Sequence, residues 1–285
     1  MIEALVLTRF DAARQRALAR KIVGEWAGEP LAPPGFLDLE VRLAFDVFVE
    51  VYIDCPERRT MRECPKCLFL LEPEEVSGAT STQGFDVVFG HKPQRGNWRF
   101  FGHGGAWVLP ENPTKKYFRA SIICGDKYQT EGHKLRRAAW DLPLERFKSR
   151  GSVLEGGTEL DASPPAAKAV AIAEFAYHVV VENVRSPGYF TEKLVDALLL
   201  KAVPIYYGAP DIGDYFDTSG FIIVQTKDHI HAALAHLTQA DYEARRPAIE
   251  RNFTTATDHW VDLQSRMQLA IDDFLSCGGK DRKQK

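Results

Sequence analysis

Apolar segments of strand length alternate with helical patterns along most of this chain, and the alternation runs in two series. In the first series, four apolar segments end in turn residues and are predicted to be strands: 3–10, 45–53, 66–73 and 84–93. After Asp11, a residue suited to cap a helix, Leu18, Ile22 and Trp26 recur every fourth residue and predict an amphipathic helix. Strands that alternate with helices favour parallel sheets covered by helices.

The second series begins after a polar, proline-bearing stretch, 107–117, which is predicted to link two domains. Its apolar segments predict further strands at 118–124, 176–183, 203–208 and 220–224. Helical patterns lie between them, at 132–142, at 191–201 and from Asp228 onward. We therefore expect an α/β protein with one domain at 1–112 and a second at 113–256. Two doubly wound domains would face a central cleft, and ligands of such sheets bind beyond the carboxyl ends of the strands.

The last helical pattern covers 257–275 and belongs to a C-terminal segment, 257–285. It places four large apolar residues on one face: Trp260, Leu263, Met267 and Ile271. That face needs a partner within the protein. The basic residues after it form only a short tail, which we expect to be solvated.

The composition restricts the class of protein. The chain has 285 residues, 45% of them hydrophobic, and a length of this kind favours two domains. The formal net charge of −3 argues against a nucleic-acid partner, because such proteins normally carry a basic surface. The sequence contains neither a long apolar stretch nor a signal-peptide pattern at its start, and its five cysteines fit a reducing compartment. We expect a cytoplasmic protein with no transmembrane anchor.

Cys64 and Cys67 form a CxxC pair, with Cys55 nearby. A structural zinc site needs about four ligands, and the sequence offers no matching second pair. Buried or inactive thiols are therefore expected at these positions, and no metal site is predicted.

The stretch from Val181 to Gly208 carries the strongest functional pattern. A predicted strand delivers Glu182 and Asn183 to the carboxyl edge of its sheet, and Thr191 can cap the next helix. Glu192 and Lys193 then occupy the first helical turn, where unsatisfied backbone N–H groups attract phosphate. Glu192 can accept hydrogen bonds from the hydroxyls of a ribose, and Lys193 adds a positive charge. The plainer interpretation is that Glu192 compensates the helix dipole and Lys193 is solvated.

The same stretch resembles the signature of the α-1,3/1,4-fucosyltransferases. The residues that match it are Glu182, Asn183, Tyr189, Thr191, Glu192, Lys193, Pro204, Tyr206 and Gly208. A weaker resemblance extends over about residues 65 to 225. It implies a GT-B fold, which consists of two Rossmann-like domains facing a cleft, and an inverting transfer of fucose from GDP-fucose to a hydroxyl of a glycan acceptor. It also implies that the donor binds in the C-terminal domain, and that the final helix packs back on the N-terminal domain.

Individual donor contacts follow from the resemblance by position. Tyr189 would contact the nucleotide, Glu192 the ribose or the sugar, and Lys193 the diphosphate. Arg136 falls where the family has a phosphate-binding arginine, and Arg137 is its main competitor. Guanidinium donors suit phosphate oxygens and stay charged. With these cations and no Asp-x-Asp triplet in the sequence, no metal or other cofactor should be required.

Inverting transfer needs a base that takes the proton of the acceptor hydroxyl. Glu72 ends a predicted strand and is our choice, with Glu74 as the alternative, because the family's Glu-Ser-Pro turn is Glu-Pro-Glu here. A solvated acidic turn is the plainer reading. His103, between glycine-rich neighbours, is a further candidate for acceptor or sugar contact, whereas His133 is expected to be structural.

Two departures from the family affect the substrate. The phenylalanine that precedes the family's Glu-Asn pair is Val181 here, and 124–127 lacks the usual Ser-Asn. A different GDP-sugar is therefore an open alternative. A non-catalytic protein that binds a nucleotide sugar or a glycan on the same scaffold is another, because the turn that should hold the base is altered. A nicotinamide-dependent dehydrogenase is excluded, since the first strand lacks the Gly-x-Gly-x-x-Gly loop.

Overall fold

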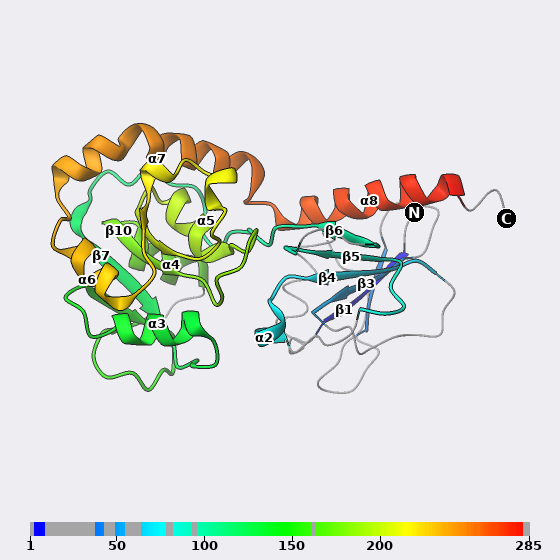
Figure 1. Cartoon of the computed structure of the whole chain (residues 1–285), viewed down its shortest axis with the longest axis horizontal. Helices are drawn as coiled ribbons and strands as arrows, with labels where there is room; N and C mark the ends of the chain where they lie inside the picture. Colours follow the sequence, from blue (N-terminus) through cyan, green and yellow to red (C-terminus); the bar gives the residue numbers. More distant parts are fainter. Residues whose placement is uncertain are drawn as a thin grey trace. The chain divides into compact units, whose positions relative to one another are not determined.

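The computed structural model describes residues 3–8, 38–42, 49–54, 64–77, 82–92, 96–160 and 164–281. The chain divides into two compact units (Figure 1). The first consists of 1–102 together with 262–285, and the second of 103–261. The helix predicted after Asp11 lies outside the described residues, as does Cys55.

The first unit is built on a largely parallel sheet. Its strands are β1 (Glu3–Thr8), β2 (Asp38–Arg42), β3 (Val49–Ile53), β4 (Lys66–Leu70), β5 (Val87–Gly90) and β6 (Trp98–Phe100), in the order β2-β1-β3-β4-β5-β6. Neighbouring strands pair in parallel except for β1 and β2, which are antiparallel. A short helix, α2 (Glu74–Ser77), follows β4, and α8 (Leu263–Asp281) returns to this unit. On α8, Met267 and Ile271 are buried in one core with β3, β4 and β5.

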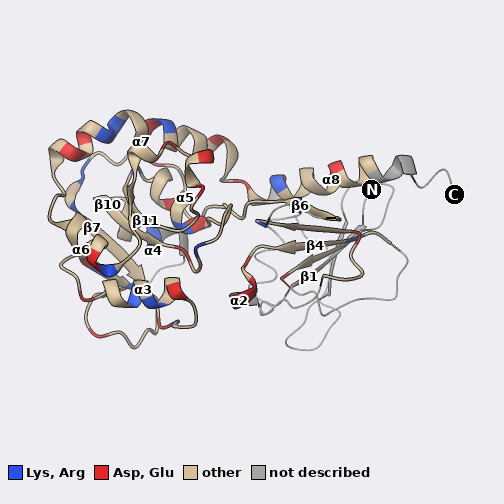
Figure 2. Cartoon of the chain, in the orientation of Figure 1, with Lys and Arg blue, Asp and Glu red and all other residues tan. Residues whose placement is uncertain are grey.

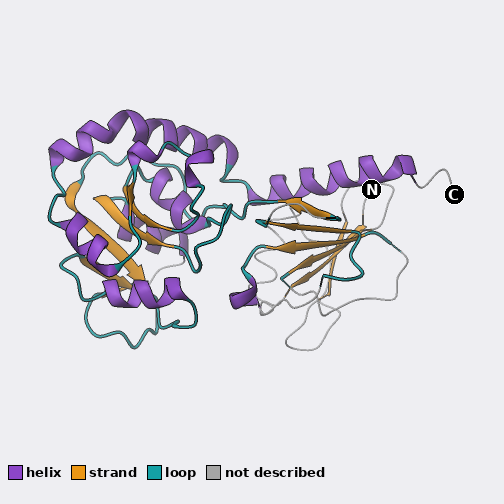
Figure 3. Cartoon of the chain, viewed as in Figure 1, coloured by secondary structure: helices purple, strands orange, loops and turns teal. Residues whose placement is uncertain are grey.

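The second unit has a fully parallel sheet with helices on both faces (Figure 3). Its strands are β7 (Tyr117–Cys124), β8 (Glu145–Lys148), β9 (Thr158–Glu159), β10 (Phe175–Val181), β11 (Val203–Tyr207) and β12 (Ile222–Ile223), in the order β12-β11-β10-β7-β8-β9. The helices are α3 (Glu131–Ala139), α4 (Pro164–Ile172), α5 (Glu192–Leu199), α6 (Lys227–Leu234) and α7 (Gln239–His259), with single 3₁₀ turns at Ile212–Asp214 and Thr218–Gly220.

Two hydrophobic cores explain why β10 lies at the centre of this unit. Residues of α4 and α5 pack on one face of the sheet, and residues of α3 and α6 pack on the other, while α7 contributes to both cores. Every residue of β10 is buried, including His178, as expected of a strand that has helices on both faces of its sheet. The structure thus confirms the α/β fold expected from the sequence, with a fully parallel sheet in the second unit and a largely parallel one in the first.

The boundary between the units differs from the expected one at 112/113, since it lies between Gly102 and His103. The residues after it pack against the second unit. Gly104 N–H donates to the carbonyl of Phe190 at 3.0 Å, and Trp107 N–H donates to Asp196 at 2.7 Å. The segment predicted to be a linker, 107–117, therefore belongs to the second unit and ends in the first residue of β7.

The single helix expected over 257–275 is divided in the structure: its first residues belong to the end of α7, and most of the rest belong to α8. α7 ends at His259, and α8 begins at Leu263, where Ser265 N–H donates to the carboxylate of Asp262 at 2.9 Å. Trp260 stays in the second unit, 4.6 Å from the ring of Phe190. The second boundary therefore lies at 261/262 and not at 256/257. Trp260 does not share the buried face of Met267, because the helix is interrupted between them.

Candidate functional site

A cavity of about 180 Å³ opens at the carboxyl ends of β7 and β10, against the first turn of α5. This is the edge at which doubly wound sheets bind their ligands. The lining residues come from strands, loops and three helices: Ile123, Cys124, Gly125, Arg136, Ser149, Lys168, Ile172, His178, Val179, Val180, Val181, Glu192, Lys193 and Asp196. Three of the predicted donor residues are among them: Arg136, Glu192 and Lys193.

The start of α5 has the predicted geometry. Thr191 is the N-cap, in extended conformation, and its hydroxyl accepts from Lys193 N–H at 3.3 Å. Glu182, fully buried, accepts from the backbone N–H of Thr191 at 2.9 Å and from its hydroxyl at 2.8 Å. The cap is thus held by a carboxylate from the end of β10. Glu182 and Thr191 fix the first turn of α5 from behind and do not line the cavity.

Arg136 reaches the same place from α3. Its guanidinium donates to the carbonyl of Val181 and, at 3.3 Å, to the side-chain oxygen of Asn183. Burial lowers the pKa of Arg136, whereas the nearby Cys124 and Glu182 raise it. The neighbouring Arg137 lies 3.8 Å from Asp126 and is not part of the cavity lining.

A close approach of two backbones places Arg136 at the end of β10. A Cβ atom at Gly132, in the first turn of α3, would lie 1.8 Å from the carbonyl oxygen of Glu182. Gly132 N–H instead donates to the carbonyl of Asn183 at 3.1 Å. The sequence analysis did not assign this role to Gly132. His133, expected to be structural, completes the cap of α3, because its ring nitrogen accepts from Thr130 N–H at 3.3 Å.

Two further charged residues of the site, Lys168 and Asp196, were not predicted from the sequence. Lys168 of α4 lies 2.8 Å from Asp196 and 3.4 Å from Glu192. Lys193 lies 3.4 Å from Glu192 and 3.9 Å from Glu182. Burial alone would raise the pKa of Glu192, but Lys193 and Lys168 outweigh it and hold that pKa well below its usual range. The Glu192 carboxylate is therefore ionised and able to accept hydrogen bonds.

The remaining predicted donor residues lie beside the cavity and not on its surface. Tyr189 is fully buried, and Asn183 is 5% exposed. His103 is half-buried, next to the point where Gly104 pairs with Thr191, and after Lys193 and Lys168 it helps to lower the pKa of Glu192. His103 thus belongs to the same electrostatic environment as the first turn of α5.

The two candidates for the base lie in the first unit. Glu72 follows β4 after Leu71, is half-buried, and its backbone N–H donates to Asp54 at 3.1 Å. Asp54 also accepts from Leu71 N–H at 2.9 Å, so one carboxylate at the end of β3 shapes the turn that presents Glu72. Glu74 is exposed in the first turn of α2 and lies 3.7 Å from Lys92. Asp54 is a support for this turn that the sequence did not reveal.

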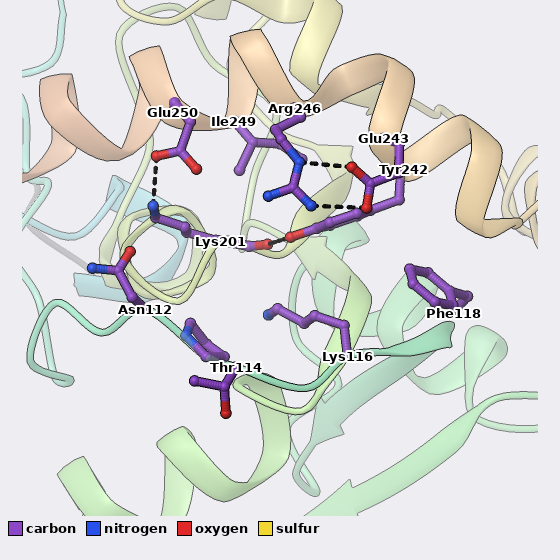
Figure 4. A pocket seen from close by; sticks show the side chains of 11 residues that line it. Asn112, Thr114, Lys116, Phe118, Lys201, Tyr242, Glu243, Arg246, Ile249 and Glu250 are labelled. Atoms are coloured by element: carbon purple, nitrogen blue, oxygen red, sulfur yellow. Dashed lines mark hydrogen bonds and ion pairs between the residues drawn. The ribbon is translucent and has the colours of Figure 1, made fainter.

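A second cavity of about 310 Å³ lies at the opposite end of the same sheet, near the start of β7 (Figure 4). Four of its charged residues form two ion pairs: Lys201 pairs with Glu250, and Arg246 pairs with Glu243. Lys116 donates to the carbonyls of Phe175 and Leu200, and burial together with Lys201 lowers its pKa to about 7. These contacts tie α5 and α7 to the sheet.

The described residues contain neither a metal-binding cluster nor a membrane-spanning helix. Cys67 is a free, buried thiol, and burial raises its pKa. Within the described ranges there is no cluster of three or more His, Cys, Asp or Glu side chains that could hold a metal ion. None of the described helices is long and apolar enough to span a membrane. Residues of both charge signs lie along α7 (Figure 2).

Comparison with known proteins supports the resemblance seen in the sequence. No protein-family model matches the chain. An alpha-(1,3)-fucosyltransferase of Helicobacter pylori is 27% identical over 66 residues, which is 23% of this chain and 14% of that relative. A GDP-fucose protein O-fucosyltransferase 3 of Bos taurus is 32% identical over 76 residues, 26% of this chain and 16% of the relative. The matches thus span only a small part of the length of either curated relative.

Solved structures share the fold at lower identity. A crystal structure of alpha1,3-fucosyltransferase with GDP has a TM-score of 0.55 at 11% identity, and the alignment covers 92% of each chain. A second, with GDP-fucose, has a TM-score of 0.50 at 14% identity and covers 75% of this chain and 80% of the other. The beta-glucosyltransferase of phage T4 has a TM-score of 0.50 at 9% identity, over 80% of this chain and 74% of the other. The chain has the α/β GT-B fold and resembles the fucosyltransferases.

Proposed function

We propose that this chain is an inverting glycosyltransferase that moves a sugar, most simply fucose, from a GDP-sugar to a hydroxyl of a glycan acceptor. The donor would bind in the cavity of the second unit. The observation that carries this proposal is the gathering of Arg136, Lys193 and Glu192 around one cavity at the N-terminus of α5. The names of the relatives, which include fucosyltransferases and GDP-fucose, support the choice of donor.

The chemistry of these residues suits a nucleoside diphosphate. Arg136 and Lys193 provide two cations, and the first turn of α5 adds unsatisfied backbone N–H groups. Positive charge at this place stabilises the diphosphate as it leaves, without a metal ion. Glu192 is ionised and can accept from ribose hydroxyls. We assign Glu182, Thr191, Asn183 and Tyr189 to the support of this turn and its loop, because they lie behind the cavity surface.

The acceptor side of the reaction belongs to the first unit in this proposal. Glu72 would take the proton of the acceptor hydroxyl as that oxygen attacks the anomeric carbon opposite the departing diphosphate. We prefer Glu72 to Glu74 because Glu72 is half-buried at the end of β4, whereas Glu74 is exposed and paired with Lys92. His103 is proposed as a contact of the sugar.

The donor can be tested by calorimetry with chelator present. GDP-fucose, GDP-mannose, GDP and UDP-glucose would be titrated separately into the full chain. We expect the GDP compounds to bind at least about tenfold more tightly than UDP-glucose. The comparison is informative because the fold is shared with a beta-glucosyltransferase as well as with fucosyltransferases. A preference for the uridine nucleotide would contradict the proposed donor.

Turnover needs a second measurement. Release of GDP from the preferred GDP-sugar should be accelerated by a suitable glycan acceptor, and nuclear magnetic resonance of the product should show inversion at the anomeric carbon. Tight donor binding without transfer to any glycan in a broad acceptor panel would favour the non-catalytic alternative.

A further inference from the structure

Lys168 is a charged residue of the donor cavity to which neither the sequence pattern nor the resemblance gives a role. It lies on α4, and its side chain is only 20% exposed. Its ammonium nitrogen lies 2.8 Å from Asp196 Oδ2 and 3.4 Å from Glu192 Oε1. Lys168 therefore joins a fully buried carboxylate to the carboxylate that opens α5.

The charges of the site form an alternating row. In order along the row they are Glu182, Lys193, Glu192, Lys168 and Asp196, with successive N–O distances of 3.9, 3.4, 3.4 and 2.8 Å. Each ammonium group thus lies between two carboxylates. Glu192, in the middle, is the only carboxylate of the row that both lines the cavity and contacts two cations.

The two cations are held differently. Lys193 makes longer contacts, at 3.1 Å to the hydroxyl of Thr191, 3.4 Å to Glu192 and 3.9 Å to Glu182, so its side chain can turn toward a ligand. Lys168 is anchored by Asp196, whose other oxygen accepts from the backbone N–H groups of Trp107 at 2.7 Å and Val108 at 3.3 Å. Charge-assisted bonds between buried partners resist rearrangement. Lys168 is therefore the cation that stays with Glu192 when Lys193 moves.

A buried carboxylate keeps its charge only while a cation or several donors face it. In the proposed function, Lys193 binds the diphosphate and gives up part of its contact with Glu192. We propose that Lys168 is a positioning residue that keeps Glu192 ionised and oriented toward the ribose hydroxyls while Lys193 engages the diphosphate. This inference rests on the proposed function, because it takes Glu192 as the group that meets the ribose.

The test is the selectivity of binding for ribose hydroxyls. Affinities for GDP, 2′-deoxy-GDP and 3′-deoxy-GDP would be measured by calorimetry. The wild type should lose about tenfold or more for the hydroxyl that Glu192 accepts, as expected for a hydrogen bond to a charged group. In Lys168→Met, this ratio should fall to within about threefold, whereas the ratio of GDP to GMP affinity should be kept. Lys134→Met is the matched control, because Lys134 pairs with Glu131 on the surface of α3.

A purely structural lysine would change stability and leave this selectivity intact. Lys168→Met leaves the buried carboxylate of Asp196 without its cation. The double variant Lys168→Met/Asp196→Asn therefore removes both charges and still leaves an acceptor for Trp107 N–H. It should show the same loss of selectivity, and adding both changes to Glu192→Gln should cause no further loss. Wild-type selectivity in the folded double variant would overturn the inference while the donor site stands. Failure of the wild type to bind GDP would instead overturn the proposed function and this inference with it.

Discussion

Arg136 and Arg137 are adjacent on α3, yet their side chains meet different surroundings. Successive residues of a helix point about 100° apart, so only one of the two can face the end of β10. Arg136 does so and lines the cavity, whereas Arg137 is paired with Asp126 near the surface. The sequence alone left this choice open, because the spacing fits either residue. The position of Gly132 against Glu182 is what orients α3 and selects Arg136.

Substitution of the two cavity cations should weaken binding of a diphosphate. Arg136→Ala and Lys193→Ala should each reduce the affinity for GDP by about 1.5–3 kcal/mol, the usual value for a hydrogen bond to a charged group. GMP, which lacks the second phosphate, should be less affected by both. Arg137→Ala is the matched control and should bind GDP as the wild type does. Unchanged GDP affinity in both cavity variants, measured by calorimetry, would place the phosphates elsewhere.

The assignment of Glu72 as the general base can be tested by kinetics. Glu72→Gln keeps the shape of the side chain and removes its ability to take a proton. Transfer should slow at least about a hundredfold, while the affinity for GDP stays the same. Glu74→Gln, in the exposed turn, should retain most of the activity. If the two variants behaved in the opposite way, Glu74 would be the base, and full activity of the double variant would exclude both carboxylates.

At the level of elements, the local signals of α5 were sufficient to predict it. Thr191 caps it, Glu192 and Lys193 open it, and apolar residues recur along its buried face. α4 was not predicted, because its whole sequence, PPAAKAVAI, consists mainly of small residues without a polar face. Lys168 was missed with it. Asp196 looked like an ordinary helical position because its partners, Trp107 and Val108, lie far away in the sequence.

The docking of α3 on β10 depends on Gly132. In Gly132→Ala, the new methyl group would collide with the carbonyl of Glu182, so one backbone must move. Overpacking of this kind costs about 1–3 kcal/mol or more in the free energy of unfolding. Gly213→Ala is the control, since its Cβ would lie 3.6 Å from Thr218, an ordinary contact. Urea unfolding should separate the two variants, and equal stabilities would contradict this account.

The central strand contains a buried histidine that links stability to pH. His178 is 5% exposed, its Nδ1 lies 2.7 Å from the hydroxyl of Ser121, and burial, with Lys168 and Lys116, lowers its pKa from 6.5 to about 3. The unfolded chain takes up this proton near pH 6.5, whereas the folded chain does so only near pH 3. The contribution of neutral His178 to the free energy of unfolding is therefore fully present above pH 6.5 and is lost progressively as the pH falls to about 3.

Between pH 7 and pH 5, this single group should lower the free energy of unfolding by about 2 kcal/mol. His178→Asn keeps an acceptor near Ser121 and removes the titration. Urea unfolding of the wild type and the variant at both pH values gives the difference attributable to His178. An identical pH dependence in the two proteins would mean that the pKa of His178 is the same in the folded and the unfolded chain.

For the whole molecule, the sequence predicted two α/β units and a final helix but not their limits. Residues 103–112 form no regular element, so periodicity has nothing to detect there, and only contacts such as Trp107 with Asp196 assign them to the second unit. Likewise, the repeat of Trp260, Leu263, Met267 and Ile271 looked continuous, although the chain leaves the second unit after Val261. Which unit an apolar side chain joins depends on long-range packing that the spacing does not contain.

The return of α8 makes the stability of the first unit depend on the last part of the chain. Met267 is fully buried in the core of β3, β4 and β5, whereas Leu269 on the same helix is 67% exposed. Met267→Ala should destabilise the first unit by about 2–5 kcal/mol, the usual cost of such a truncation in a core, and Leu269→Ala should have little effect. Amide hydrogen exchange should show lower protection in β4 and β5 of Met267→Ala, with β10 and the affinity for GDP unchanged. Equal loss of protection in β10 would mean that α8 stabilises both units, and no loss in β4 would remove Met267 from the core of the first.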